Sequence, residues 1–433
     1  MNKNKKLKDI IVVGFALFAI FFGAGNLIFP PYIGVVAGKK WYEVMWGFLM
    51  TDPFLPIFGV IVTAKVGGRA DAIGKRVSPI FSKTLGAICM LIIGPFFAIP
   101  RTAATTHDIA AKQLLPEIPL LVTSLIFFAL TAFLVFNQGK VLDKIGKYLT
   151  PGLLLILVII IVYTMINPLG EMLEMPADNL FLTGFTEGYQ TMDALGSALL
   201  AGIVMADISR RGYTEKKEQI TVMIGVGAVT FVLLAFIYGG LTYVGATAGT
   251  YFTPETPRTE ILVGIVYKIF GNIGKIFIGI VVSLACLTTS VGLAATCGNY
   301  FESISERKLK YKQIVIASVL LSFILSLLGV EKLIYFAVPV LMISYPVVIV
   351  LMIMTAFDEK IKYDLTYTGA VIGTLGVSIV QSMNGFFGIW PTLGERVNEL
   401  PLSPIGLGWF VPAAICALIF TLIAAQREKM KKA

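Results

Sequence analysis

Four polar or charged side chains stand in stretches of the chain that are otherwise apolar. Asp193 lies in GYQTMDALGSALLAGIV, Arg101 lies in GPFFAIPRTAATT, and Thr288 and Thr289 lie in SLACLTTSVGLAA. A carboxylate at mid-bilayer costs at least ~2.5 kcal/mol on insertion scales, so ionisable groups in apolar spans indicate function. Asp193 could meet a substrate ammonium or a coupling cation, or it could cap a helix that restarts beside it.

The hydroxyl groups of Thr288, Thr289 and the next residue, Ser290, could serve as hard oxygen ligands for a small cation such as Na⁺. The alternative is that they bond back to their own helix, as Ser and Thr often do in membrane helices. Arg101 is a candidate gate, paired with Asp108 or Glu187, or else an anchor that snorkels to the membrane interface.

Asp52 precedes Pro53 in a predicted span, where it could cap a kinked helix or handle a proton or ion. His107 is the only histidine and is expected at the interface. The residues therefore offer no nucleophile–base pair and no metal-ligand spacing, which argues against an enzyme and against a bound cofactor.

The element that must position these groups is the stretch GFALFAIFFGAGNLIFPP, residues 14–31. Each glycine in a helix interior costs about 1 kcal/mol relative to alanine, and Pro30 and Pro31 lack an N–H to donate. We therefore expect a helix broken at Gly23, Ala24, Gly25 and Asn26. Irregular backbone at membrane depth must be buried in protein or line a cavity, which predicts a central binding site. The alternative is an intact helix with a glycine-rich packing face.

Composition identifies the chain as an all-α integral membrane protein. Of its 433 residues, 57% are hydrophobic and only 14% are charged, against about 25% charged in soluble domains. A span needs about 20 apolar residues. Twelve spans are predicted in a single transmembrane domain over 1–433, at 10–36, 41–65, 84–106, 119–137, 148–167, 186–207, 220–245, 276–301, 313–330, 333–356, 365–387 and 404–425. Residues 251–275 are predicted to be a loop with a short helix near 259–270.

Most of the 35 Lys and Arg residues fall in loops on the side of the two termini. Because cytoplasmic loops are enriched in these residues, both termini are expected inside. The basic charge is thus explained by membrane orientation and does not suggest nucleic acid. The span at 186–207 is also expected to be interrupted, from Thr191 to Ser197. Two five-span units of inverted topology are therefore predicted, at 10–167 and 186–356, followed by two further helices over 365–425.

The motifs in residues 14–31, 94–106, 188–204 and 283–295 resemble the bacterial branched-chain amino acid carrier family, also called the LIVCS family. The resemblance covers essentially the whole chain. It implies membership of the amino acid–polyamine–cation superfamily and the sodium–leucine symporter fold, with broken helices 1 and 6. It also implies a location in the bacterial cell membrane.

The resemblance further implies roles for individual residues. The break at Gly23, Ala24, Gly25 and Asn26 would receive the substrate carboxylate on backbone N–H groups. Na⁺ would be bound by the carbonyls of Ala19 and Phe22 together with Ala285, Thr288 and Thr289. Substrate-binding residues of helix 6 are placed by its interruption alone, at Thr191, Met192, Asp193, Ala194 and Ser197.

The sequence thus predicts a symporter that takes up leucine, isoleucine or valine with Na⁺ across the lipid bilayer. Coupling to H⁺ through Asp193 or Asp52 is an alternative within the same class. An amino acid sensor that binds but does not transport is an alternative from a different class.

Overall fold

A computed structural model of the chain describes residues 3–68, 73–136, 140–176 and 178–432. Within these ranges the regular secondary structure is helical, and the one β-type pairing is an isolated bridge between Gly38 and Glu174. Helices satisfy every backbone N–H and C=O within one segment, which is what an apolar surrounding demands. The expected all-α fold class is therefore confirmed.

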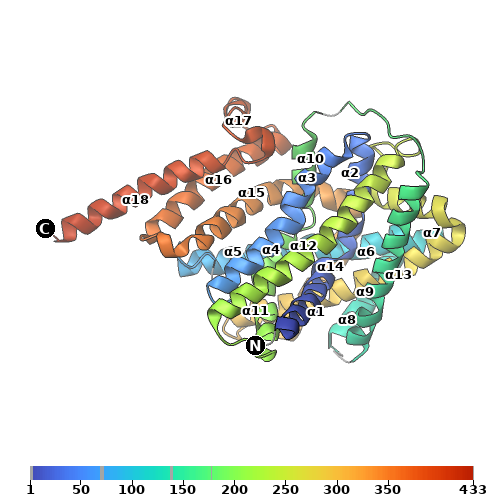
Figure 1. Ribbon diagram of the computed structural model, residues 1–433, viewed down its shortest axis with the longest axis horizontal. Helices are drawn as coiled ribbons and strands as arrows, with labels where there is room; N and C mark the ends of the chain where they lie inside the picture. Colours follow the sequence, from blue (N-terminus) through green and yellow to red (C-terminus); the bar gives the residue numbers. More distant parts are fainter. Residues whose placement is uncertain (1–2, 69–72, 137–139, 177, 433) are drawn as a thin grey trace.

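Nine helices occupy the first part of the chain (Figure 1). They are α1 (Lys3–Phe21), α2 (Phe29–Ala37), α3 (Trp41–Leu49), α4 (Leu55–Lys65), α5 (Pro79–Leu91), α6 (Ala98–Thr106), α7 (Lys112–Leu114), α8 (Leu120–Phe136) and α9 (Lys140–Ile166).

Nine more follow an extended connection. They are α10 (Leu180–Tyr189), α11 (Asp193–Arg210), α12 (Lys216–Thr247), α13 (Arg258–Ile304), α14 (Tyr311–Ser326), α15 (Val330–Ala356), α16 (Asp364–Phe387), α17 (Pro391–Asn398) and α18 (Phe410–Lys432).

Seven helical segments of the described chain are long and apolar enough to cross a membrane. Two further pairs pass the same test together but are bent at a short break, and three shorter helices are also apolar. Large apolar side chains such as Phe133, which is 62% exposed, cover the outer surface. The chain is therefore a multi-pass membrane protein.

Both predicted helix breaks are present. The segment Asn4–Phe21 meets Gly25–Ala37 at 90°, and a 3-10 turn over Ala24–Leu27 joins α1 to α2. The segments Leu180–Tyr189 and Asp193–Arg210 meet at 50°. The second break is shorter than predicted: it covers residues 190–192, and Gly196 and Ser197 lie inside α11.

Three long spans are also kinked. Asp52 (φ −146°, ψ 111°) interrupts the span made by α3 and α4, and Gly94 (φ −97°, ψ −119°) interrupts the span made by α5 and α6. Gly271 has a φ of 62°, which favours glycine, and divides α13 into a first part near the predicted short helix at 259–270 and the span that follows.

Glycine pairs bring the broken helices close to their neighbours. A Cβ on Gly34 of α2 would overlap the carbonyl oxygen of Thr242 in α12, and a Cβ on Gly245 would overlap that of Pro31. Gly47 of α3 and Gly184 of α10 face each other's helices in the same way. Small residues at such contacts let two helix backbones approach closely, which fixes α2 and α10 against the bundle.

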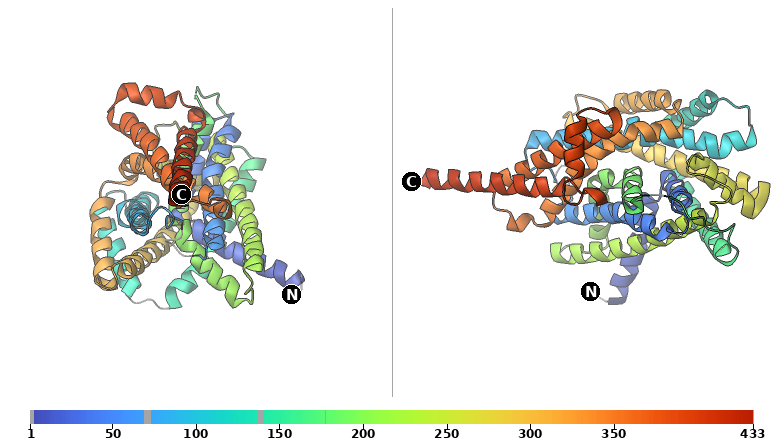
Figure 2. Two further views of the ribbon diagram at one scale, coloured as in Figure 1. Left: turned by 90° about the vertical axis from the view of Figure 1, so that its left-hand side faces the viewer. Right: turned by 90° about the horizontal axis from the view of Figure 1, so that it is seen from above.

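The last two long helices form an arm. α16 packs along α18, whose C-terminal end projects beyond the rest of the bundle, far from the N-terminus (Figures 1 and 2). Two sequence predictions are corrected here. The last span begins at Phe410 rather than at residue 404, and the short helix α17 was not predicted.

Candidate functional site

A central cavity of about 140 Å³ lies where the two broken helices meet. Its wall combines residues from both breaks with residues of α6 and α13. The lining residues that bear on the predicted site are Gly23, Gly25, Asn26, Arg101, Thr191, Met192, Asp193, Gly196 and Thr289. The wall also contains apolar side chains from Ile20, Ile93, Leu199, Leu200 and Leu293, and the hydroxyl groups of Thr102, Thr105 and Thr296.

Asn26 connects the two breaks. Its Nδ2 atom lies 2.7 Å from Asp193 Oδ2, 2.8 Å from Tyr238 Oη, 3.0 Å from the Phe21 carbonyl oxygen and 3.3 Å from Asp52 Oδ2. An amide carries two N–H donors, so these four oxygens compete for it. Asp193 is therefore held by a contact across the cavity.

Asp52 is fully buried behind this contact. The prediction that it caps the restart of a kinked helix is wrong, because α4 begins after Phe54 without a side-chain cap and the Asp52 carboxylate contacts the Asn26 amide instead. Its Oδ1 atom has no hydrogen-bond partner in the described part of the chain. Two carboxyl groups thus share one neutral amide in a buried position.

Arg101 is also buried, at 5% exposure, so the snorkelling interpretation is wrong. Its Nη1 donates to the Gln190 carbonyl oxygen over 2.7 Å, and its guanidinium lies 5.3 Å from the centroid of the Phe29 ring. The proposed partners are engaged elsewhere: Asp108 accepts from Thr259, and Glu187 pairs with Arg258. Arg101 therefore links α6 to the break between α10 and α11.

His107 is buried at 8% exposure, with its Nδ1 atom 3.1 Å from Thr123 Oγ1. It lies in the π-helical segment His107–Ala111, which continues the helix and packs against α13. Its location at the membrane interface stays a prediction.

The residues predicted for the second broken span, which is formed by α10 and α11, divide into two groups. Thr191, Met192 and Asp193 line the central cavity, and Met192 has a φ of 64°, which turns the chain at the break. Ala194 and Ser197 line a separate pocket with Cys89 and Met352, and the Ser197 hydroxyl donates to the Ala194 carbonyl oxygen over 2.7 Å. These two residues are not brought to the central cavity.

The break in the first helix frees two carbonyl groups that the sequence singled out. In a regular helix the Gly23 and Asn26 N–H groups would bond Ala19 and Phe22. Here the Gly23 N–H bonds the Phe21 carbonyl oxygen at 2.8 Å, and the Asn26 N–H bonds that of Gly23 at 3.1 Å. The carbonyls of Ala19 and Phe22 thus lose their usual donors and become available as cation ligands.

The facing residues of α13 are arranged as follows. A Cβ on Gly23 would lie 3.8 Å from Thr289 Oγ1, which places Thr289 beside the break. Thr288 Oγ1 donates to the Ala285 carbonyl oxygen over 2.9 Å. Thr288 therefore bonds to the backbone of its own helix, which was the alternative to cation binding. Because the hydroxyl donates in this bond, its lone pairs are still available as acceptors.

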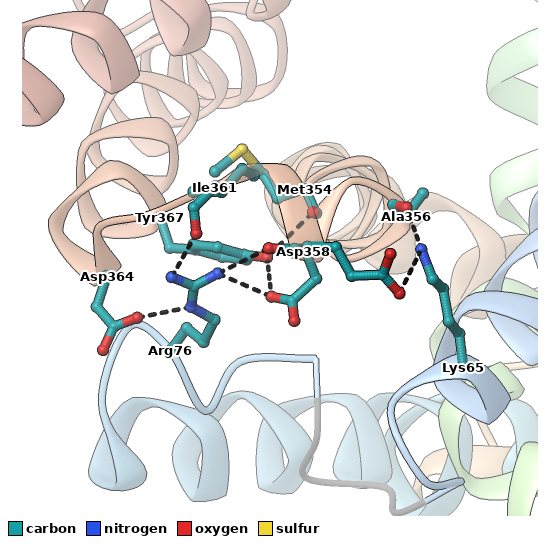
Figure 3. A network of polar contacts seen from close by, with 9 residues as sticks. Lys65, Arg76, Met354, Ala356, Asp358, Ile361, Asp364 and Tyr367 are labelled. Atoms are coloured by element: carbon teal, nitrogen blue, oxygen red, sulfur yellow. Dashed lines mark hydrogen bonds and ion pairs between the residues drawn. The ribbon is translucent and has the colours of Figure 1, made fainter.

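Two clusters of charged residues lie outside the cavity. Arg258 pairs with Glu187 at 2.7 Å and with Glu331 at 2.6 Å, and its guanidinium lies 3.9 Å from the Tyr32 ring centroid. In the second cluster, Figure 3 shows Arg76 between two carboxylates, with Asp358 at 2.9 Å and Asp364 at 2.6 Å. These clusters join helices that are far apart in the sequence.

Burial acts against ionisation of Asp358, but hydrogen bonds from Tyr367 and Arg76 outweigh it and lower the pKa of this carboxyl group. The Tyr367 hydroxyl lies 2.7 Å from Asp358 Oδ1. Asp358 follows α15 and Arg76 precedes α5, so the ion pair is formed between two connecting segments (Figure 3).

The sequence did not identify Tyr238 and Gln190 as site residues. Tyr238 stands on α12, and its hydroxyl contacts the Asn26 amide. The same helix also contains Tyr243 and several threonines, so no pattern in the sequence distinguished Tyr238. Gln190 contributes a backbone carbonyl, which no side-chain pattern reveals.

Residues 6–427 match the family model described as branched-chain amino acid transport protein. The chain belongs to this family. It is 36% identical to the branched-chain amino acid permease BraB of Bacillus subtilis (strain 168), over 97% of this chain and 96% of that protein. It is 33% identical to the permease BrnQ of the same strain, over 98% of this chain and 100% of that protein.

The resemblance inferred from the motifs is therefore confirmed, and the family is one of transport proteins and not of enzymes. The fold is similar to that of Mhp1 in its inward facing conformation, with a TM-score of 0.63 and 14% identity. That likeness covers 96% of this chain and 91% of Mhp1, and it shows a transporter fold.

Proposed function

We propose that the protein takes up leucine, isoleucine and valine across the bacterial cell membrane by symport with Na⁺. The observation that carries the proposal is the meeting of two broken helices at one cavity, where Asn26 Nδ2 lies 2.7 Å from Asp193 Oδ2. The printed names of the relatives, branched-chain amino acid permeases, support the substrate class.

Each part of a branched-chain amino acid has a counterpart in the cavity. The first N–H groups of a helical turn have no partner within it and favour an anion, so those of Ala24 and Gly25 receive the carboxylate. Asp193 receives the ammonium group. Leu199 and Leu293 contact the branched side chain.

Na⁺ binds between α1 and α13 in this proposal. The carbonyls of Ala19 and Phe22, the Ala285 carbonyl, and the hydroxyl groups of Thr288 and Thr289 are its ligands. A cation shared by two helices stabilises the arrangement that holds them together, and its release frees them to move apart.

The proposed architecture has twelve spans. The seven long segments, the two bent pairs and the three shorter apolar helices supply that number. The first break heads one five-span unit and the second break heads another. An odd number of spans inverts the second unit relative to the first, and both termini then lie in the cytoplasm with the two extra helices, α16 and α18.

The direction of the cavity follows from this orientation. Thr296, which lines it, lies on the side of α13 expected to face the cytoplasm, and Thr105, which also lines it, lies near the end of α6 expected to face outward. The central cavity therefore extends from the two breaks along both directions of the membrane normal.

Uptake of radiolabelled leucine, isoleucine and valine into proteoliposomes tests the proposal. Accumulation is expected only with an inward Na⁺ gradient. Accumulation driven equally by other monovalent cations would overturn Na⁺ coupling, and the absence of uptake despite leucine binding would indicate a sensor.

A second candidate is coupling to H⁺. Asp52 and Asp193 both contact the Asn26 amide, and two carboxylates at this spacing repel each other in a buried site. A proton on one of them relieves that repulsion, so proton uptake could accompany substrate binding. Leucine accumulation driven by an acidic exterior without Na⁺ would favour this candidate.

A further inference from the structure

Arg101 is a buried arginine without a carboxylate partner among the described residues. Arg76, Arg211 and Arg258 are all more exposed than Arg101, and each of them contacts two carboxylates. A buried charge is costly unless a counter-charge compensates it. Arg101 therefore indicates an anion that does not come from the chain itself.

The Arg101 guanidinium also has unused hydrogen-bond donors. A guanidinium carries five N–H groups, and among the described residues Arg101 has one acceptor, the Gln190 carbonyl oxygen, which lies 2.7 Å from Nη1. The contact with the Phe29 ring, 5.3 Å from the centroid, is made by the charge and not by an N–H group. Because Arg101 lines the central cavity, the remaining donors are available to a bound ligand.

The free end of the guanidinium lies against the first helix break. A Cβ on Gly25 would lie 2.8 Å from Arg101 Nη2, so this nitrogen stands directly beside the Gly25 backbone. The Gly25 N–H is one of the two groups proposed above to receive the substrate carboxylate. A carboxylate has two oxygen atoms and binds arginine strongly through charge-assisted hydrogen bonds. One carboxylate can therefore accept from the Gly25 N–H and from Arg101 at the same time.

The central cavity keeps two opposite charges apart. Asp193 and Arg101 both line it, and no ion pair joins them. Asp193 contacts the Asn26 amide at 2.7 Å, whereas Arg101 contacts the Gln190 carbonyl oxygen. An α-amino acid carries an ammonium group and a carboxylate on the same carbon atom. Such a zwitterion matches a cavity that offers separated charges of both signs.

We propose that Arg101 is the counter-ion of the substrate carboxylate and makes this charge a requirement for binding in the central cavity. Nη2 donates to the carboxylate, while Nη1 keeps its bond to the Gln190 carbonyl oxygen. Amides, esters and amines with the same branched side chain are rejected, because they leave the Arg101 charge uncompensated. The inference rests on the proposed function, which supplies the amino acid as the substrate.

This arrangement also connects the carboxylate to both helix breaks. Arg101 lies beside Gly25 in the first break and bonds to Gln190 in the second. A carboxylate held by the Gly25 N–H and by Arg101 is therefore linked through a single side chain to the second break. Arg101 thus acts in substrate selection and in holding the two breaks around the bound substrate.

Binding of leucine and of leucinamide to the full-length protein in detergent with Na⁺, measured by isothermal titration calorimetry, tests the inference. The two ligands share the ammonium group and the side chain, but leucinamide lacks the carboxylate charge. Arg101→Met should weaken leucine binding about thirtyfold, the usual effect of losing a hydrogen bond between charged groups. It should not weaken leucinamide binding, because that ligand has no charge for Arg101 to compensate.

Arg101→Lys is a second variant, which keeps a positive charge in the fold. An ammonium group lacks the planar fork of the guanidinium, so leucine should bind more weakly than in the unmodified protein but still in preference to leucinamide. Thr106→Val is the matched control on the same helix. The Thr106 hydroxyl donates to the Thr102 carbonyl oxygen over 2.9 Å, within its own helix, and both affinities should stay unchanged.

The outcomes separate this inference from the proposed function. If the affinities for leucine and leucinamide fall by the same factor in both Arg101 variants, Arg101 is structural and the inference is overturned, while the proposed function stands. A full preference for leucine that survives in Arg101→Met would overturn it as well. No leucine bound by the unmodified protein would overturn both.

Discussion

The Oδ2 atom of Asp193 lies 2.7 Å from the Nδ2 atom of Asn26, although the two residues are 167 positions apart in the chain. Each stands beside a helix break, so the contact joins the two points at which regular hydrogen bonding is interrupted. A substrate that binds Asp193 must either replace the Asn26 amide as its partner or bind beside it. Substrate binding therefore depends on how far apart the two breaks lie.

Replacing Asp193 by alanine should abolish leucine uptake at micromolar substrate, because it removes the carboxylate proposed to receive the ammonium group. Radiolabelled uptake in proteoliposomes measures the effect. Ser197→Ala is the matched control, since Ser197 lies on the same helix but faces another pocket. Equal losses in the two variants would show that the effect comes from helix α11 as a whole.

Thr288→Ala should raise the Na⁺ concentration needed for half-maximal uptake about fivefold, because it removes one hydroxyl ligand of the proposed Na⁺ site. A fivefold change corresponds to about 1 kcal/mol, which is the usual net contribution of one hydrogen bond. Leucine affinity at saturating Na⁺ should change little. Ser283→Ala removes a comparable bond to the backbone of the same helix, 2.7 Å long, away from the break. An unchanged Na⁺ curve for Thr288→Ala would remove Thr288 from the proposed cation site.

Gly25→Ala should weaken leucine binding. Its Cβ would lie 2.8 Å from Arg101 Nη2, so Arg101 would have to shift and its bond to Gln190 would be strained. Gly292→Ala provides the control, because a Cβ there has no neighbour within 4 Å among the described residues. Binding isotherms that show the same affinity for both variants would contradict this prediction.

Arg258→Met should lower the free energy of unfolding by about 3–5 kcal/mol, the usual cost of removing one partner from a buried ion pair. The side chains of Arg258 and Glu187 are 11% and 17% exposed, so little water replaces the lost contact. Thermal unfolding in detergent measures the change. Lys39→Met, which breaks an exposed pair with Glu174, should have almost no effect.

Asp358→Asn should lower thermal stability at neutral pH and lose this effect in acid. The pKa of Asp358 is lowered in the folded protein, so its contribution is complete above the ordinary pKa of about 4 and disappears as the pH falls through the folded value. Melting temperatures of both proteins measured across that range should converge. A constant difference at all pH values would show that the Asp358 carboxylate charge is not what stabilises the fold.

The first break was predictable because its cause is local: Gly23, Gly25 and Pro30 disfavour a regular helix in any surroundings. The second was placed too broadly, because residues 190–192 contain neither glycine nor proline. That break coincides with a tertiary contact, the bond from Arg101 to the Gln190 carbonyl oxygen. The periodicity of apolar residues does not reveal a hydrogen bond between two distant segments, so it could not place this break.

Roles that depend on distant partners were predicted least well. Asp52 was interpreted as a helix cap or as a group that handles a proton or ion, and the cap is wrong because its carboxylate contacts the Asn26 amide. Arg101 was interpreted as a gate or as an interfacial anchor, and the anchor is wrong because the folded chain buries it. In both cases the deciding contact comes from a residue far away in the sequence.

Helix α15 is tied down near both ends, by Arg258 at Glu331 and by Arg76 at Asp358 immediately after it. Any movement of α15 relative to the start of α13 or to the segment before α5 must lengthen one of these ion pairs or carry its partner along. The two attachments therefore oblige these three parts of the chain to move together for as long as both ion pairs are kept.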